Sequence, residues 1–324
     1  MFIMRFDMRL PAMSPAGSAD LYAAALDMAE WAEQHGCLQL IVSEHHGSDD
    51  GYLPAPLILA AAMAGRTRSI GIQLAALVLP LHDPVSLAEE MAVLDIASNG
   101  RVSYVLAVGY RPEEYAMFGH DFADRGKRMD KCLEALRHAW TGEPFEFEGR
   151  SARVTPTPLT PQGPGLLLGG NTRAAARRAA RFGLGMLTQG SNSEMVEIYE
   201  RECRKIGTTP GACINPPGDT VTTAFVASDP DRAWAELGPY LLHDARSYAA
   251  WLGDHNKAVT RSTASSVDEL REQQGPYRIF TPQQAVEHIK QTGFLITQPL
   301  CGGLPPELAW PSLKLIAGEV LPRV

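Results

Sequence analysis

A chain of 324 residues with 45% hydrophobic and 20% charged residues suits a globular protein with a large core. Its net charge of −8 argues against nucleic acid or an anionic membrane as the main partner. Five scattered cysteines without a CxxC pair, no signal peptide and no apolar stretch of transmembrane length lead us to expect free thiols in a cytoplasmic protein.

Short apolar runs alternate with stretches of helical periodicity along the chain. Strands are predicted at 2–8, 38–42, 70–80, 101–109, 166–168, 184–188, 220–226 and 294–297. Helices are predicted at 18–35, 54–65, 83–99, 124–140, 172–182, 194–206, 230–242, 281–291 and 306–321. The remaining segments are expected to be a loop at 110–123, a small hairpin with a proline-rich loop at 141–165, and an irregular stretch at 244–277.

The stretch 70–109 reads as one β-α-β unit. Its helix opens with Asp83, a good N-cap, followed by Pro84 at the first helical position. Asn99 and Gly100 end the helix, because glycine tolerates the left-handed conformation that a C-cap needs. The two flanking strands should therefore be parallel and joined by a right-handed crossover.

Alternation of these eight strands with the predicted helices indicates a parallel sheet with helices outside it. We expect an α/β protein with a closed (β/α)8 TIM barrel, formed by residues 1–324 as a single domain with an excursion at 141–165. A doubly wound open sheet is the alternative. We expect the irregular stretch 244–277 to be a lid, since long irregular segments in barrels often cover the mouth.

Glu44-His45-His46 follows the predicted strand 38–42. In a barrel, functional residues lie at the carboxyl ends of strands, and histidine exchanges protons near neutral pH. General acid/base chemistry and a hydrogen-bonded structural role are equally good interpretations. A zinc site is disfavoured because no carboxylate falls at HExxH spacing, so no metal is expected.

Ala75 and Ala76 lie near the end of the third strand. Small residues there would let the backbone approach a flat ring, although packing inside a barrel also favours them.

Gly169-Gly170-Asn171-Thr172 links a strand to a helix N-terminus. Bare N–H groups and the helix dipole attract phosphate at such a turn, and a plain capped turn is the alternative. Arg125 is either a second phosphate ligand or an exposed arginine at a helix start.

Several motifs in this order resemble the luciferase-like flavin monooxygenase family. They are AALVLP-x3-P, a helix ending in ASNGR, a strand closing on GYRPEEY-x2-FG, and the Glu-His-His triplet also found in bacterial luciferase. The resemblance covers most of the chain and weakens between about 207 and 280. It implies the TIM barrel and a homodimer formed through helices on one side of it.

The resemblance also implies roles for single residues. It places His45 at the flavin as the catalytic histidine, with Glu44 and His46 beside it, and it implies a cis peptide between Ala75 and Ala76. The cofactor contacts that we expect are Ala75, Ala76, Gly109, Tyr110, Arg125, Gly169, Gly170, Asn171 and Thr172.

Two positions depart from relatives in this family. Ala107 stands where bacterial luciferase has a reactive cysteine, so light emission is not implied. Tyr110 stands where the deazaflavin-dependent sugar-phosphate dehydrogenases have a glutamate, which argues against that substrate.

The activity implied is a monooxygenase that uses reduced FMN, supplied by a separate reductase, and O2 on a small organic substrate. The alternative is hydride transfer with the deazaflavin coenzyme F-420. A third possibility is a non-catalytic flavin-binding subunit, which the presence of the Glu-His-His triplet and the Gly-Gly-Asn-Thr turn disfavours.

Overall fold

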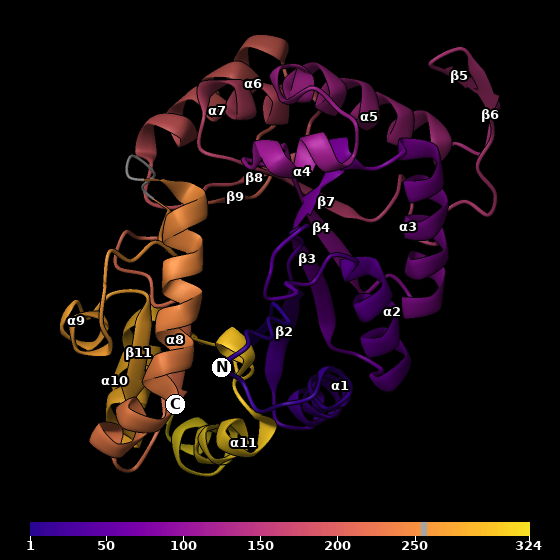
Figure 1. Ribbon diagram of the computed structural model, residues 1–324. Helices are drawn as coiled ribbons and strands as arrows, with labels where there is room; N and C mark the ends of the chain where they lie inside the picture. Colours follow the sequence, from indigo (N-terminus) through magenta and orange to yellow (C-terminus); the bar gives the residue numbers. More distant parts are fainter. Residues whose placement is uncertain (254–257) are drawn as a thin grey trace. The chain divides into compact units, whose positions relative to one another are not determined.

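The computed structural model describes residues 1–253 and 258–324, which form two compact units (Figure 1). Unit 1 comprises Met1–Pro54 and Pro217–Val324, and unit 2 comprises Ala55–Pro216. No helix in the described residues is long and apolar enough to cross a membrane. All five cysteines are free thiols, as predicted, and only Cys213 is more than slightly exposed.

Unit 1 contains a parallel sheet in the order β12-β1-β2 and a separate parallel pair, β10-β11. Alternate residues of β1, Phe2, Met4 and Phe6, are buried, as the period of a strand requires. The strands are β1 (Phe2–Phe6), β2 (Cys37–Val42), β10 (Thr223–Val226), β11 (Tyr277–Phe280) and β12 (Leu295–Thr297). The helices are α1 (Ser18–Gln34), α8 (Pro230–Leu252), α9 (Val267–Glu272), α10 (Pro282–Thr292) and α11 (Pro306–Leu315).

Unit 2 contains five parallel strands in the order β3-β4-β7-β8-β9 and the antiparallel hairpin β5-β6. The strands are β3 (Gly71–Val78), β4 (Val102–Ala107), β5 (Phe145–Phe147), β6 (Arg150–Ala152), β7 (Gly165–Gly169), β8 (Gly185–Leu187) and β9 (Cys213–Ile214). The helices are α2 (Pro56–Arg66), α3 (Pro84–Ser98), α4 (Pro112–Met117), α5 (Arg125–Ala139), α6 (Arg173–Arg181) and α7 (Ser193–Ile206). The predicted hairpin at 141–165 is therefore confirmed.

The β-α-β unit that opens unit 2 has the local chemistry that the sequence predicts. The Asp83 carboxylate caps α3 by accepting hydrogen bonds from the backbone N–H groups of Val85 and Ser86. Asn99 ends the helix in the left-handed conformation, with φ 56°. Strands β3 and β4 are parallel, as expected.

Two predictions about local structure are wrong, and two strands were missed. Residues 244–252 are helical, because α8 continues to Leu252 with Asp244 and Tyr248 buried, so the irregular, lid-like segment cannot begin at 244. Its residues 254–257 lie outside the described part of the chain, and α9 and the start of β11 occupy part of the rest. The loop at 110–123 contains α4. Strands β9 and β11 were not predicted, because two and four residues are too few to show a period.

Candidate active site

In unit 1, the carboxyl end of β2 carries the predicted histidines. Glu44, His45 and His46 are all buried. The His46 Nε2 atom lies 2.8 Å from the Glu44 Oε1 atom and forms a hydrogen bond with it. Glu44 therefore fixes the orientation of the His46 ring.

His45 lies in an aromatic environment. Its ring centroid is 4.6 Å from Trp251 and 4.9 Å from Tyr52, and the Tyr248 ring is 6.5 Å away. We call Tyr52, Tyr248 and Trp251 the aromatic box. Tyr248 and Trp251 lie in the part of α8 that the sequence did not predict to be helical, which is why both were missed.

In unit 2, the peptide between Ala75 and Ala76 is cis, as predicted. The register of β3 against β4 shifts there, since Ala75 pairs with Val105 and Leu77 pairs with Leu106. Ala76 is thus one extra residue in β3 at this point.

Gly109 follows β4 with φ 71°, a left-handed conformation that favours glycine. A Cβ atom at this position would lie 2.7 Å from the Val78 Cγ1 atom, so the backbone and the end of β3 are packed closely. Tyr110, the next residue, is partly exposed.

Arg125 lies over the Phe122 ring at 3.9 Å and donates a 2.7 Å hydrogen bond to the Phe122 carbonyl. The structure therefore gives Arg125 a local partner, and its role toward a phosphate stays a prediction.

The Gly-Gly-Asn-Thr turn joins β7 to α6. Gly170 has φ 154°, and a Cβ there would lie 2.8 Å from the Ala175 Cβ, so only glycine lets the turn pack against α6. Thr172 caps α6 by accepting a 3.2 Å hydrogen bond from the Ala175 N–H. The remaining N–H groups of the first turn of α6 and the helix dipole make this turn suitable for a phosphate.

Three polar residues that the sequence analysis did not predict form a chain of hydrogen bonds that begins at Asn171 of this turn. Asn192 Nδ2 donates to Asn171 Oδ1 at 2.9 Å, and the Asn192 backbone N–H donates to Asn215 Oδ1 at 2.9 Å. The Thr188 hydroxyl donates to the same Asn215 oxygen at 2.7 Å. Hydrogen bonds thus connect residues that follow β7, β8 and β9. The amide group of Asn171 also carries N–H donors, which could face an anion.

A glycine turn that links a parallel strand to a helix N-terminus is typical of α/β sites that bind a phosphate group. Residues 2–293 match the luciferase-like monooxygenase family. The chain belongs to this family, and the predicted resemblance is confirmed.

Two curated relatives illustrate how far the sequence similarity extends. The chain is 34% identical over 147 residues to an uncharacterised protein of Mycobacterium bovis, covering 44% of this chain and 51% of that protein. It is 28% identical over 144 residues to the oxygenase component of flavin-dependent trigonelline monooxygenase of Acinetobacter baylyi, covering 44% and 40%. The chain thus spans about half the length of the curated relatives it matches.

Solved structures share the fold over nearly the whole chain. Monooxygenase RslO1 from Streptomyces bottropensis matches with a TM-score of 0.76 and 22% identity, covering 99% of each chain. The oxygenating constituent of 3,6-diketocamphane monooxygenase from Pseudomonas putida, solved with FMN, matches with a TM-score of 0.72 and 20% identity, covering 100% and 98%. An F-420-dependent secondary alcohol dehydrogenase matches with a TM-score of 0.66 and 15% identity, covering 95% and 97%.

Proposed function

We propose that this protein is a flavin-dependent monooxygenase that uses reduced FMN and O2 to oxidise a small organic substrate. The observation that carries the proposal is the turn Gly169–Thr172 in unit 2, where bare backbone, the helix dipole and Asn171 offer donors to a phosphate. The match to the luciferase-like monooxygenase family supports a flavin as the cofactor.

We further propose that residues 1–324 form a single domain with a closed (β/α)8 barrel.

The residues of the chain would divide the work between anchoring and proton transfer. Gly169, Gly170, Asn171 and Thr172 would hold the phosphate of FMN, with Arg125 as a further ligand. Ala75, Ala76 and Gly109 would lie against the ring system, because small side chains let the backbone approach a flat group. Tyr110 would be a further contact of the cofactor. His45 would give or take a proton at the reacting atoms, and Glu44 would hold His46 beside it.

When bound, reduced FMN would supply the two electrons needed for one atom of O2 to enter the substrate and the other to leave as water. Because one curated relative is named as the oxygenase component of its enzyme, we propose a separate flavin reductase as a partner.

The alternative function is hydride transfer with coenzyme F-420 and without O2. It is supported by the fold shared with an F-420-dependent secondary alcohol dehydrogenase. Both cofactors carry a phosphate on a flexible chain, so the turn at 169–172 suits either. A non-catalytic flavin-binding subunit is a third candidate, which the buried Glu44–His46 pair beside His45 disfavours.

Titration of the purified protein with FMN, reduced FMN and F-420 distinguishes these functions. We expect reduced FMN to bind most tightly and its bound form to support O2-dependent oxidation of an added substrate. Preferential binding of F-420 would replace the monooxygenase by the hydride-transfer enzyme. Binding of none of the three would contradict both.

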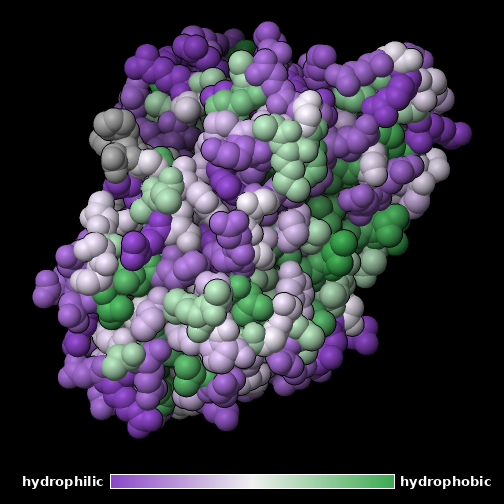
Figure 2. Space-filling model, viewed as in Figure 1, coloured by the Kyte–Doolittle hydropathy of each residue, from purple (hydrophilic) through white to green (hydrophobic). Residues whose placement is uncertain are grey.

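We also propose a homodimer formed through α2 and α3, which lie side by side in unit 2 (Figure 1). Ile58 on α2 is 74% exposed, and Val93 and Ile96 on α3 are 53% and 43% exposed. Figure 2 shows hydrophobic side chains gathered on this part of the surface. Such a patch favours association.

The dimer is tested by sedimentation of Val93→Glu and Ile58→Glu variants. We expect both to be monomers at concentrations where the wild type is a dimer. Leu38→Glu changes an exposed hydrophobic residue of unit 1 and serves as the control. A wild-type monomer, or a dimer in all three variants, would contradict this interface.

A further inference from the structure

Arg9 lies in a turn directly after β1 whose backbone is unusual. Met8, between Asp7 and Arg9, has φ 59° although it is not glycine, and it is buried. Such a conformation is uncommon for a methionine and persists only where the surroundings enforce it. The Arg9 backbone N–H donates a 3.2 Å hydrogen bond to the Asp7 carboxylate, so the turn holds the two residues together.

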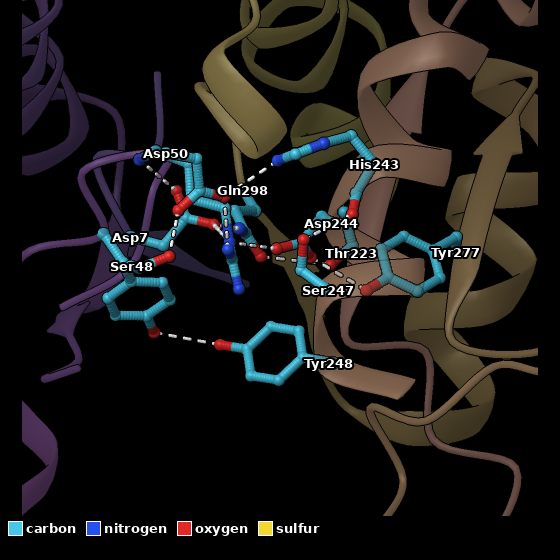
Figure 3. A network of polar contacts seen from close by, with 12 residues as sticks. Asp7, Ser48, Asp50, Thr223, His243, Asp244, Ser247, Tyr248, Tyr277 and Gln298 are labelled. Atoms are coloured by element: carbon cyan, nitrogen blue, oxygen red, sulfur yellow. Dashed lines mark hydrogen bonds and ion pairs between the residues drawn. The ribbon is translucent and has the colours of Figure 1, made fainter. Parts of the chain in front are cut away.

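The edge of the Arg9 guanidinium binds three carboxylates from three parts of unit 1. Its Nη1 atom lies 2.5 Å from Asp50 Oδ2, and its Nε atom lies 2.9 Å from Asp244 Oδ1 and 3.4 Å from Asp7 Oδ2. Figure 3 shows these carboxylates converging, Asp7 and Asp50 from the N-terminal segment and Asp244 from α8. Arg9 is completely buried, so this cluster lies in the interior.

Other polar groups also bind the three carboxylates. Gln298 donates a 2.7 Å hydrogen bond to Asp7, and Tyr277 donates a 2.8 Å bond to Asp244. His243 Nε2 lies 2.8 Å from Asp50, which also accepts a bond from Ser48.

The pKa values of the Asp7 and Asp50 carboxyls shift in opposite directions. Burial and the nearby Asp244 raise the pKa of Asp7 well above its usual value. Burial also opposes ionisation of Asp50, but the hydrogen bond from His243 and the charge of Arg9 hold the pKa of Asp50 below its usual value. Without the guanidinium, buried negative charge would lose its counter-ion, which is strongly unfavourable.

The face of the same guanidinium lies against the aromatic box. Its carbon is 4.4 Å from the Trp251 centroid, 4.7 Å from that of Tyr52 and 5.2 Å from that of Tyr248. The buried Nη2 atom has no hydrogen-bond partner in the described residues, and the ring faces offer it electron density instead. The hydroxyls of Tyr52 and Tyr248 are 2.9 Å apart and form a hydrogen bond, which links α8 to the loop after β2.

These same three rings surround His45. We propose that Arg9 is a positioning residue for His45: it anchors α8 through Asp244 and holds the aromatic box in the arrangement that orients the imidazole. The functional meaning of this orientation rests on the catalytic role proposed above for His45, whereas the physical coupling between Arg9 and His45 does not. Neither the position nor the charge of Arg9 is otherwise used by the proposed chemistry.

The coupling is measured by NMR of the His45 ring in the full chain, with the signal assigned by its loss in His45→Gln. Ring currents from Trp251 and Tyr52 should displace the wild-type resonance from that of an exposed histidine. In Arg9→Met we expect most of this displacement to be lost. In Arg9→Lys it should be partly retained, because lysine keeps the charge but lacks the planar fork. Arg101→Met removes a partly buried arginine of unit 2 that bonds backbone carbonyls, and it should leave the His45 signal unchanged.

If Arg9→Met does not fold, Arg9→Lys and Tyr248→Phe decide the question. Tyr248→Phe removes the bond to Tyr52 without changing charge, and it should shift the His45 signal in the same direction as Arg9→Lys. Folded variants with lower thermal stability but an unchanged His45 signal would make Arg9 a purely structural residue and overturn the proposal. Normal turnover of His45→Gln would instead refute the catalytic role of His45 and leave the measured coupling standing.

Discussion

The candidate site residues of unit 1 act mainly through their side chains, whereas those of unit 2 act mainly through their backbone. In unit 1, the group around His45 and Arg9 consists of large side chains that are buried, except for the half-buried Trp251: the carboxylates of Glu44, Asp7, Asp50 and Asp244, the arginine and the aromatic box. In unit 2, the group consists mainly of backbone: a cis peptide, two glycines in left-handed or extreme conformations and the N-terminus of α6. Asn171 and Asn192 are its principal side chains.

This difference indicates that the two groups are sensitive to opposite kinds of substitution. Unit 1 should be sensitive to truncation of a side chain, since each buried charge there depends on a partner. The group in unit 2 should be sensitive to the addition of a side chain, because the backbone at Gly109 and Gly170 is packed too closely for a Cβ atom. The predictions below test this contrast.

The largest effect is expected for His45→Ala in unit 1. Turnover per folded molecule, measured with a flavin reductase and O2, should fall by roughly 10²–10⁴-fold, because a general acid or base is lost. Affinity for FMN should change little. His288→Ala is the matched control, since His288 is a half-buried histidine of unit 1 that stacks on Phe280 at 5.1 Å. A normal turnover together with a lower thermal stability would identify His45 as structural.

A smaller effect is expected when a methyl group is added to unit 2. Gly109→Ala should lower the free energy of unfolding by roughly 2–5 kcal/mol, of which about 1–2 arises from the left-handed backbone and about 1–3 from crowding against Val78. Gly119→Ala has a similar φ of 70° and open space around the new Cβ, so only the backbone part should appear. Urea denaturation of both variants measures the difference. Equal losses would show that close packing at Gly109 is unimportant.

The smallest effect is expected for Asn192→Ser. Serine can still cap α7 but is too short to reach Asn171, so the variant isolates that one hydrogen bond. Affinity for FMN should fall by about 2–10-fold, corresponding to roughly 0.5–1.5 kcal/mol for one neutral bond. Isothermal titration of wild type and variant gives the ratio. An unchanged affinity would separate Asn171 from the phosphate site.

Regular elements with a strong local signal could be predicted from the sequence. Asp83 and Asn99 bound α3 as their residue types require, and the capping box of Thr281 and Gln284 forms at the start of α10. The cis bond at Ala75 followed from the family resemblance, because no property of two alanines predicts it.

Features that depend on distant partners could not be predicted. The second half of α8 contains Asp244, a charged residue that is not expected in a core. Its burial is explained by its partners Arg9 and Tyr277, which lie far from it in the sequence. Asn215 follows β9, a strand of two residues without a detectable pattern. Its hydrogen bonds to Thr188 and Asn192 therefore could not be predicted either.

The central claim, that the turn of unit 2 anchors the phosphate of a flavin, is tested most directly by Thr172→Glu. The affinities of this variant for FMN and for riboflavin, which lacks the phosphate, should be compared with those of wild type. Repulsion and the lost cap should weaken FMN binding by about 10–100-fold, corresponding to roughly 1.5–3 kcal/mol for a bond to a charged group, and leave riboflavin binding nearly unchanged. Thr172→Ser should behave as wild type, because serine retains the capping hydroxyl. An unchanged ratio of the two affinities in Thr172→Glu would contradict the account.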